Sequence, residues 1–264
     1  MSNLENIIKN FQKLNIHPVI GLEWEFYLLD QDQPLSEEQL SIFSKNITNP
    51  IQNNQSIIIE REYGNGQIEI KTKPYHNIAK LCQDFISIKK SVRIIANKMN
   101  LEADFSAQKY PDDCGSSLQI NINFLNNHNN NVFVGSSDNE SQLLLYAIAG
   151  ILKYTPEFLD NYIADKEDLT RFDKNLNINL HRSGKYTAPT NISWGYDNRT
   201  TAIRIIGKDH NRRLEFRVPS SNSYIIRVIE SLLKSVSYGI NEKNIPINAT
   251  YGNSFKENFI TLYA

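Results

Sequence analysis

The stretch Glu23-Trp24-Glu25-Phe26 alternates acidic and apolar side chains, which is the pattern of a β-strand with one polar face and one buried face. The same alternation of charged positions occurs in Glu62 through Glu69, in Asn198 through Arg204, and in Arg213-Leu214-Glu215-Phe216-Arg217. We therefore predict strands whose charged residues share one face. Glutamates and arginines gathered on such faces are typical of a site that holds cations and a phosphate group.

The chain as a whole has an ordinary globular composition, with 264 residues, 40% of them hydrophobic and 22% charged. Its net charge of −1 predicts no attraction to nucleic acid or to an anionic membrane surface. The longest apolar run, residues 143–152, is too short to span a bilayer, and the N-terminus shows no signal peptide. Cys82 and Cys114 are too few for a disulfide framework or a thiolate metal site. We expect a cytoplasmic protein with neither nucleic acid nor a membrane as partner.

The order of the expected elements favours an α+β fold, because hairpins and long helices mix without a βαβ rhythm. A capping box at Ser36-Glu37-Glu38-Gln39 begins a helix that runs through about residue 47. Pro156 is expected in the first turn of a short helix. Helical spacing predicts further helices over residues 4–14, 77–99, 140–153 and 225–240. Alternation predicts strands over residues 19–29, 57–62, 67–73 and 117–124 and within 186–218.

Asn65-Gly66 is the strongest hairpin signal in the chain. With these two residues at the turn, Glu62 would face Glu69 directly across the hairpin. Directly opposed like charges destabilise a sheet, and a divalent cation between them would reverse that effect. Exposure of both glutamates at the hairpin end is the ordinary alternative, and the hairpin taken alone favours it.

The other charged stretches also have ordinary explanations when each is taken alone. Glu23 and Glu25 fit the polar face of an amphipathic strand, and Arg213, Glu215 and Arg217 fit an ion-pair ladder with a neighbouring strand. Together, however, carboxylates on separate segments with arginines at fixed offsets predict a channel for Mg²⁺ and polyphosphate. Arginine suits this role because its planar fork binds phosphate oxygens in pairs.

Five motifs follow one another along the chain: Gly21-Leu-Glu-Trp-Glu-Phe-Tyr-Leu-Leu-Asp30, Glu62-Tyr-Gly-Asn-Gly-Gln-Ile-Glu69, Gly115-Ser-Ser-Leu-Gln119, Asn198-Arg-Thr-Thr-Ala-Ile-Arg204 and Arg213-Leu-Glu-Phe-Arg217. In order and spacing this series resembles the catalytic domain of glutamine synthetase. The resemblance implies a curved, mainly antiparallel sheet with flanking helices, of the glutamine synthetase and guanido kinase type. It divides the chain into an N-terminal helix over residues 1–18 and a catalytic domain over residues 19–264.

The resemblance also implies roles for individual residues. One metal ion, Mg²⁺ or Mn²⁺, would be held by Glu25, Glu62 and Glu69, and a second by Glu23, Gln119 and Glu215. ATP, the co-substrate, would contact Asn121, Asn123, Arg199, Arg204 and Arg213. The substrates would contact Gly115, His181, Arg182, Thr187 and Arg217. Arg199 and Arg217 would be the catalytic residues.

Several positions depart from the family pattern. Gln119 and Asn121 stand where the family has histidines, and Thr187 stands where a glutamate receives the ammonium ion. His181 occupies the place of the arginine that binds the α-carboxylate of glutamate, with Arg182 one residue away. Only about 18 residues precede the first predicted strand, so we do not expect the family's N-terminal β-grasp domain. A homo-oligomer is possible, but the family's ring is not assured.

The pattern predicts an ATP- and Mg²⁺-dependent ligase that joins a small carboxylate to an amine through an acyl phosphate. Because Thr187 supplies no negative charge, the acceptor is expected to be an amine other than free ammonia. One alternative is a catalytically impaired regulatory protein that binds metal and nucleotide. Another is a phosphagen-type kinase, which would need no ammonium site.

Overall fold

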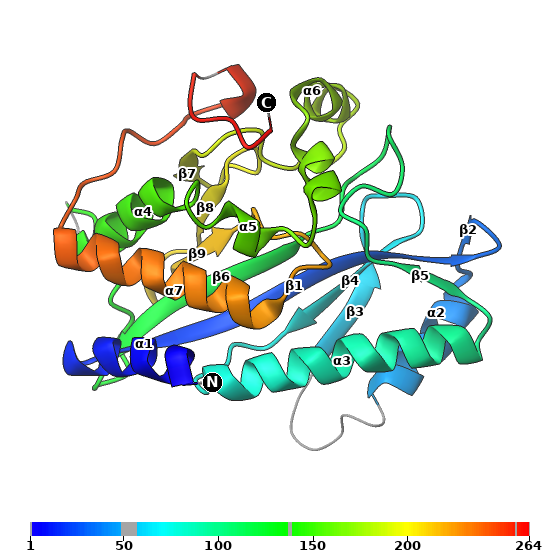
Figure 1. The fold of residues 1–264 in the computed structure, drawn as a ribbon, viewed down its shortest axis with the longest axis horizontal. Coiled ribbons are helices and arrows are strands. Elements are labelled where there is room, and N and C mark those ends of the chain that lie inside the picture. Colours follow the sequence, from blue (N-terminus) through cyan, green and yellow to red (C-terminus); the bar gives the residue numbers. More distant parts are fainter. Residues whose placement is uncertain (1, 49–56, 137–138, 257, 264) are drawn as a thin grey trace.

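The computed structural model describes residues 2–48, 57–136, 139–256 and 258–263 (Figure 1). Its α-helices are α1 (Ser2–Lys13), α2 (Glu37–Thr48), α3 (Ile78–Lys98), α4 (Gln142–Tyr154), α5 (Leu159–Tyr162), α6 (Lys174–Arg182) and α7 (Ile225–Glu242). Its strands are β1 (Ile16–Asp30), β2 (Gln33–Pro34), β3 (Ile57–Arg61), β4 (Gln67–Thr72), β5 (Glu102–Asp104), β6 (Leu118–Asn126), β7 (Trp194–Tyr196), β8 (Ile203–Ile206) and β9 (Arg213–Phe216). Short 3₁₀ helices are η2 (Lys166–Phe172), η3 (Asp209–Asn211) and η4 (Ser254–Lys256).

Within the described residues these strands form one sheet in the order β3-β4-β1-β6-β9-β8-β7, and β2 and β5 also pair with β1. Every pairing is antiparallel except that of β7 with β8. The predicted α+β fold with a mainly antiparallel sheet is confirmed. The long strand β1 lies between β4 and β6, and so connects the hairpin β3–β4 to β6 and the strands beyond it.

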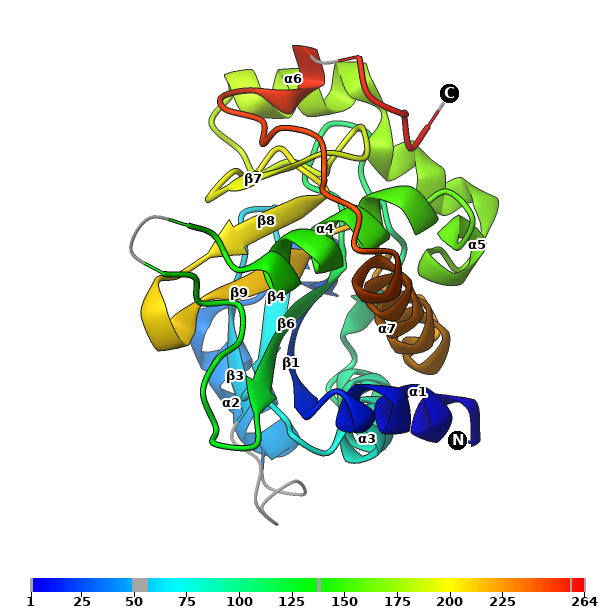
Figure 2. The same ribbon diagram turned by 90° about the vertical axis from the view of Figure 1, so that its left-hand side faces the viewer.

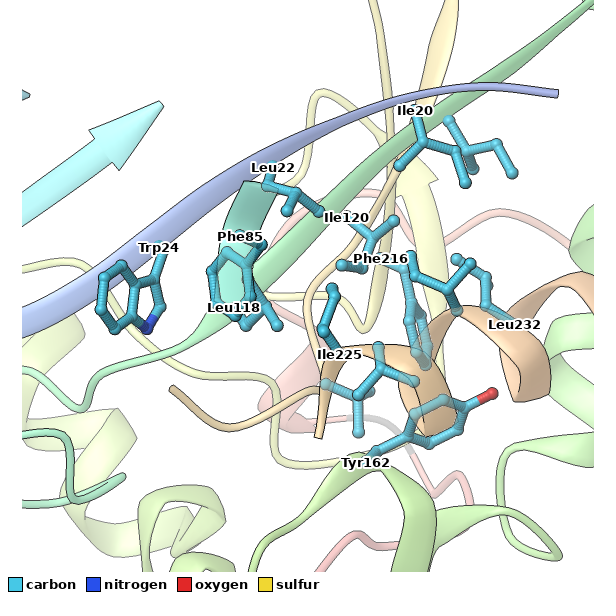
Figure 3. Close-up of a cluster of buried hydrophobic side chains, with 14 of the residues drawn as sticks. Ile20, Leu22, Trp24, Phe85, Leu118, Ile120, Tyr162, Phe216, Ile225 and Leu232 are labelled. Atoms are coloured by element: carbon cyan, nitrogen blue, oxygen red, sulfur yellow. The ribbon is translucent and has the colours of Figure 1, made fainter. Parts of the chain in front are cut away.

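Side-chain alternation on β1 and β6 separates the core from the site. Leu118, Ile120, Ile122 and Phe124 point inward as predicted, each no more than 1% exposed, and Trp24 of β1 lies with them. Helices α1, α3 and α7 cover this face of the sheet (Figure 2). Figure 3 shows side chains from the sheet packed against residues of α3 and α7. Burial of each such large apolar side chain stabilises the fold by about 1.5–3 kcal/mol.

Helices α4 and α7 approach each other closely at two glycines. A Cβ atom on Gly150 would lie 2.1 Å from the carbonyl oxygen of Ser235, and one on Gly239 would lie 2.1 Å from that of Tyr146. Since these neighbours are backbone atoms, only glycine fits at this crossing. Helix α1 packs on both β1 and α7, and the proposed division at residue 18 stays a prediction.

The capping box is present as predicted: the backbone N–H of Ser36 donates to Oε1 of Gln39 at 2.9 Å, and the backbone N–H of Gln39 donates to Oγ of Ser36 at 3.2 Å. Other predicted details are wrong. Residues 198–202 form turns, so only the end of the expected 198–204 strand belongs to β8. Pro156 lies before α5 rather than in its first turn. The helices η2 and α6 were not anticipated, because residues 165–182 show no strong apolar period.

The hairpin register differs from the prediction by two residues. Glu69 lies opposite Glu60, not Glu62, because the backbone N–H of Glu62 pairs with the carbonyl of Gln67. The side chain of Gln67 accepts from the N–H of Gly64 at 3.0 Å, and the N–H of Asn65 donates to Asp113 at 2.8 Å. These bonds select a longer loop than the two-residue turn that Asn65-Gly66 suggested.

Candidate active site

A cavity of about 640 Å³ opens on the sheet face opposite the helices. Its acidic residues are Glu23, Glu25, Glu60, Glu62, Glu69 and Glu215. Its basic residues are Arg61, Lys71, Arg171, Arg199, Arg204, Arg213 and Arg217. The cavity thus gathers both kinds of charge that the alternating strands predicted.

Strand register explains why the carboxylates meet. Glu60 of β3 lies opposite Glu69 of β4, which lies opposite Glu25 of β1. In the next row along β1, Lys71 and Gln119 flank Glu23 on the two neighbouring strands. Three carboxylates in a lateral row repel one another, so the sheet needs compensating charge at this place.

Glu25 is 7% exposed and is held by three hydrogen bonds. It accepts from the N–H and the hydroxyl of Ser117, both at 2.8 Å, and from the side-chain amide of Gln119 at 2.6 Å. Burial raises the pKa of Glu25, and the bonds from Ser117 oppose that rise. Its position is therefore fixed by Ser117 and by Gln119 of the neighbouring strand β6.

Lys71 is a site residue that sequence reasoning missed. Its ammonium group lies 2.7 Å from Glu69, whose side chain is only 4% exposed, and it also pairs with Glu60. Lys71 follows Glu69 by two positions on β4, so strand periodicity places both on the cavity face. The alternation along β4 is therefore the sequence signal that indicates Lys71.

The carboxylates raise one another's pKa values. Burial, followed by the negative charge of Glu25, raises the pKa of Glu62 to about 7. The same two causes, in the same order, raise the pKa of Glu69 to about 9 even though Lys71 opposes the shift. Lys71 therefore compensates the negative charge of the acidic end only in part.

The basic end of the cavity centres on Glu215 of β9. Burial raises the pKa of Glu215, and the charge of Arg217 opposes the rise. Arg204 of β8 lies 3.5 Å from Glu215 and also binds Asp197. Arg213 donates to the side-chain oxygen of Asn121 at 2.8 Å. These contacts hold Arg204 and Arg213 at the rim of the same cavity.

Arg217 is fully engaged with the backbone around the site. It donates to the carbonyl of Thr187 at 3.0 Å and to those of Arg199 and Thr201, and it lies 3.4 Å from Glu215. It therefore ties the segment around Thr187 to the turn that carries Arg199. The exposed guanidinium of Arg199 lies over the ring of Tyr186, 4.2 Å from its centroid.

The structure brings most of the predicted site residues to this cavity. Those that line it are Glu23, Glu25, Glu62, Glu69, Gly115, Gln119, Thr187, Arg199, Arg204, Arg213, Glu215 and Arg217. His181 and Arg182, both exposed on α6, do not line it and border a hollow beside Phe255. His181 also lines an adjoining cavity that shares Tyr186, Thr187, Arg199 and Arg204 with the site. Asn121 reaches the site only through Glu23 and Arg213, and Asn123 lies further along β6.

A divalent cation such as Mg²⁺ requires several oxygen donors that converge on one point. Among the described residues, no group of three or more His, Cys, Asp or Glu side chains is arranged to hold a metal ion. The first predicted set still fits in its chemistry, because Glu25, Glu62 and Glu69 supply the oxygen donors that Mg²⁺ and Mn²⁺ prefer. A cation bound by these three carboxylates would reduce the repulsion between them.

The second predicted set fits less well. Gln119 uses its amide nitrogen to hold Glu25, and Glu215 is already paired with Arg204 and Arg217. Asn121 donates to Glu23 at 2.9 Å. Glu25 and Glu69 of the first set are also held by protein partners, namely Ser117, Gln119 and Lys71, so the number of cations stays a prediction.

The family profile described as "Glutamine synthetase, catalytic domain" matches residues 52–261. The chain belongs to the glutamine synthetase family. No described helix is long and apolar enough to cross a membrane.

Curated relatives match at low identity. The γ-glutamylputrescine synthetase PuuA of Escherichia coli (strain K12) is 26% identical over 268 residues, which cover 91% of this chain and 55% of that protein. The glutamate–isopropylamine ligase of a Pseudomonas species is 29% identical over 198 residues, which cover 74% of this chain and 41% of that protein. The chain thus spans about half the length of the curated relatives that it matches.

Solved structures support the fold. The GmaS/ADP complex superposes with a TM-score of 0.80 at 17% identity, covering 96% of this chain and 62% of that one. The glutamine synthetase of Plasmodium falciparum also superposes with a TM-score of 0.80 at 17% identity, and the match covers 97% of this chain and 58% of that one.

Proposed function

We propose that this protein is an ATP-dependent carboxylate–amine ligase that forms an amide through an acyl phosphate, with Mg²⁺ or Mn²⁺ as cofactor. The observation that carries the proposal is the cavity in which carboxylates of β1 and β4 face arginines of β8 and β9. Membership of the glutamine synthetase family supports carbon–nitrogen ligase chemistry.

Transfer of a phosphoryl group from ATP to a carboxylate requires positive charge around the group in transit. Arg199, Arg204 and Arg213 line the cavity and supply that charge. A divalent cation bound by Glu25, Glu62 and Glu69 would neutralise further charge on the phosphate oxygens. Arg217 keeps the Arg199 turn in place through its bonds to backbone carbonyls.

The acceptor in this proposal is an amine other than free ammonia. Thr187 lines the cavity and is 6% exposed, and its side chain carries no charge to attract an ammonium ion. Tyr63 and Tyr186, whose ring centroids lie 3.7 Å apart, line the same cavity and offer an apolar surface to a substituted amine. The names of the relatives from Escherichia coli and Pseudomonas, which include putrescine and isopropylamine, support this choice.

The experiment is a panel of acids and amines incubated with ATP and Mg²⁺ or Mn²⁺. The acids begin with glutamate, and the amines include ammonium, isopropylamine and putrescine. We expect phosphate release and an amide product, seen by mass spectrometry, that require acid, amine and cation together. Glu69→Gln should abolish turnover, whereas Glu157→Gln, on the exposed surface, should not. Intact nucleotide binding without an amide in any combination rejects the proposal.

One observation favours a second candidate, a regulatory protein that binds nucleotide without turnover. Lys71 already supplies positive charge to Glu60 and Glu69, in the place where a catalytic cation would act. Such a protein would be stabilised by ATP in a thermal shift assay, and the panel would release no phosphate.

A further inference from the structure

Lys71 is the basic residue at the acidic end of the cavity. Its ammonium group lies 2.7 Å from Glu69, whose side chain is only 4% exposed, and it also pairs with Glu60, whose side chain is 43% exposed. In the part of the chain that the structure describes, no other basic side chain lies within ion-pair distance of Glu25, Glu62 or Glu69. Lys71 thus places a cation of the protein among the carboxylates that are predicted to bind a metal ion.

The two carboxylates that Lys71 contacts lie in different surroundings. Glu69 is in the middle of the acidic row, between Glu25 of β1 and Glu60 of β3, which is the outermost described strand. Neighbouring strands lie about 4.8 Å apart, so the flexible four-carbon stem of a lysine spans the distance from one carboxylate to the next. Glu60 is not one of the residues predicted to hold a metal ion. Lys71 therefore has a second, more exposed partner that stays free for it.

Lys71 and a divalent cation would compete for Glu69. The oxygen atoms of Glu69 suit Mg²⁺ and Mn²⁺, and the ammonium group of Lys71 already donates to one of them. Two cations held by one carboxylate would also repel each other. Binding of the metal ion at Glu69 and the contact between Lys71 and Glu69 therefore oppose each other.

We propose that Lys71 is a displaceable internal cation: it neutralises Glu69 in the metal-free protein and withdraws to Glu60 when a divalent cation binds. This inference rests on the cation site of the proposed function but not on turnover. In the metal-free protein, Lys71 reduces the repulsion within the row of Glu25, Glu60 and Glu69. The same contact lowers the affinity of the site for the cation, because Lys71 has to leave Glu69 first.

The first test follows the reactivity of Lys71 in the unmodified protein. Lysines are acetylated to a limited extent with acetic anhydride, with and without Mg²⁺, and each modified peptide is quantified by mass spectrometry. Release from Glu69 removes one of the two ion pairs that keep Lys71 unreactive, so Mg²⁺ should raise its acetylation rate about threefold or more. Lys185 is the internal control, because its side chain is 35% exposed, against 34% for Lys71, and it pairs with Asp113. Its rate should not change.

The second test measures the competition with a variant. In titration calorimetry with Mn²⁺ and no nucleotide, Lys71→Met should bind the cation about 10-fold more tightly or better, because no protein cation has to leave Glu69. Arg61→Gln is the matched control. Arg61 lines the same cavity with a side chain that is 35% exposed, but it pairs with Glu37 of α2. This variant removes the same charge and should change the affinity by less than about threefold.

An acetylation rate of Lys71 that Mg²⁺ leaves unchanged or lowers would overturn the inference. So would an affinity for Mn²⁺ that is unchanged or weaker in Lys71→Met, an equal gain in Arg61→Gln, or no measurable Mn²⁺ binding in either Lys71→Met or the unmodified protein. If Lys71→Met does not fold, the acetylation rates decide alone. Because neither measurement needs turnover, an inactive protein whose Lys71 responds to Mg²⁺ refutes only the ligase proposal. An active ligase whose Lys71 does not respond refutes only the displacement of Lys71.

Discussion

Replacing Glu69 by glutamine should change how the stability of the metal-free protein depends on pH. Glu69 is 3% exposed, and burial together with Glu25 raises its pKa from 4.5 to about 9. Below pH 4.5 the carboxyl group is protonated in both the folded and the unfolded state, so it does not make the free energy of unfolding depend on pH. As the pH rises above 4.5 the unfolded chain ionises while the folded protein retains its proton. The unfolded state then binds fewer protons, so stability falls until the pH reaches about 9.

The expected slope of the free energy of unfolding against pH follows from the one proton that Glu69 keeps in the folded state and loses in the unfolded state. A difference of one bound proton changes the free energy of unfolding by about 1.4 kcal/mol per pH unit. Between pH 6 and pH 8 the loss is therefore about 2–3 kcal/mol, which for a chain of this size lowers Tm by roughly 5–10 °C. Glu62, whose pKa is raised to about 7, adds to the slope in the lower part of that range.

The assay is thermal unfolding in the presence of a chelator across this pH range. The unmodified protein should lose stability as the pH rises, and Glu69→Gln should flatten most of the slope because glutamine has no proton to release. Glu157→Gln, an exposed surface change, is the matched control and should keep the slope. Stability that rises with pH, or an equal slope in Glu69→Gln, would refute the conclusion that burial and Glu25 keep Glu69 protonated in the folded protein.

Three further outcomes are expected. Gly150→Ala should lower the free energy of unfolding by about 2–3 kcal/mol in urea denaturation, because the added Cβ meets the backbone of α7. The control Gly184→Ala has open space but a φ of +79°, and should lower the free energy of unfolding by about 1 kcal/mol. Equal losses in the two variants would contradict the close packing of α4 and α7. Arg213→Gln should raise the KM for ATP about tenfold or more in the phosphate-release assay, with the KM for the amine unchanged. Thr187→Glu should raise kcat/KM for ammonium relative to kcat/KM for a substituted amine by about tenfold, since it places negative charge at that position of the cavity. A shift of this ratio toward the substituted amine would contradict the placement of the amine acceptor beside Thr187.

Local sequence patterns predicted the faces of the strands well. The alternation of Leu118 and Ile120 with Gln119 fixed which side of β6 is buried, and that decision depends only on the period of a strand. The capping box before α2 was equally local. Features of this kind need no knowledge of distant residues.

Patterns that depend on distant contacts were predicted less well. The predicted hairpin register was wrong because Gln67 and Asp113 stabilise a longer loop. Asp113 lies far along the chain, so the local pattern around Asn65-Gly66 contains no sign of it. Arg171, which lines the cavity, was missed because a 3₁₀ helix leaves no apolar period. His181 and Arg182 were assigned by resemblance, and neither lines the cavity itself, although His181 lines an adjoining cavity that shares Thr187 and Arg199 with it.

The proposed function requires that a carboxylate oxygen of the acid attacks the terminal phosphorus of ATP and then leaves with the phosphate when the amine forms the amide. The most direct test uses an acid labelled with ¹⁸O in its carboxylates, with the amine that supports turnover, and mass spectrometry of the released phosphate. An acyl phosphate intermediate predicts one ¹⁸O atom in each phosphate formed, in step with the amide. Phosphate without label, as simple ATP hydrolysis would give, or a stable phosphorylated amine, would contradict the claim.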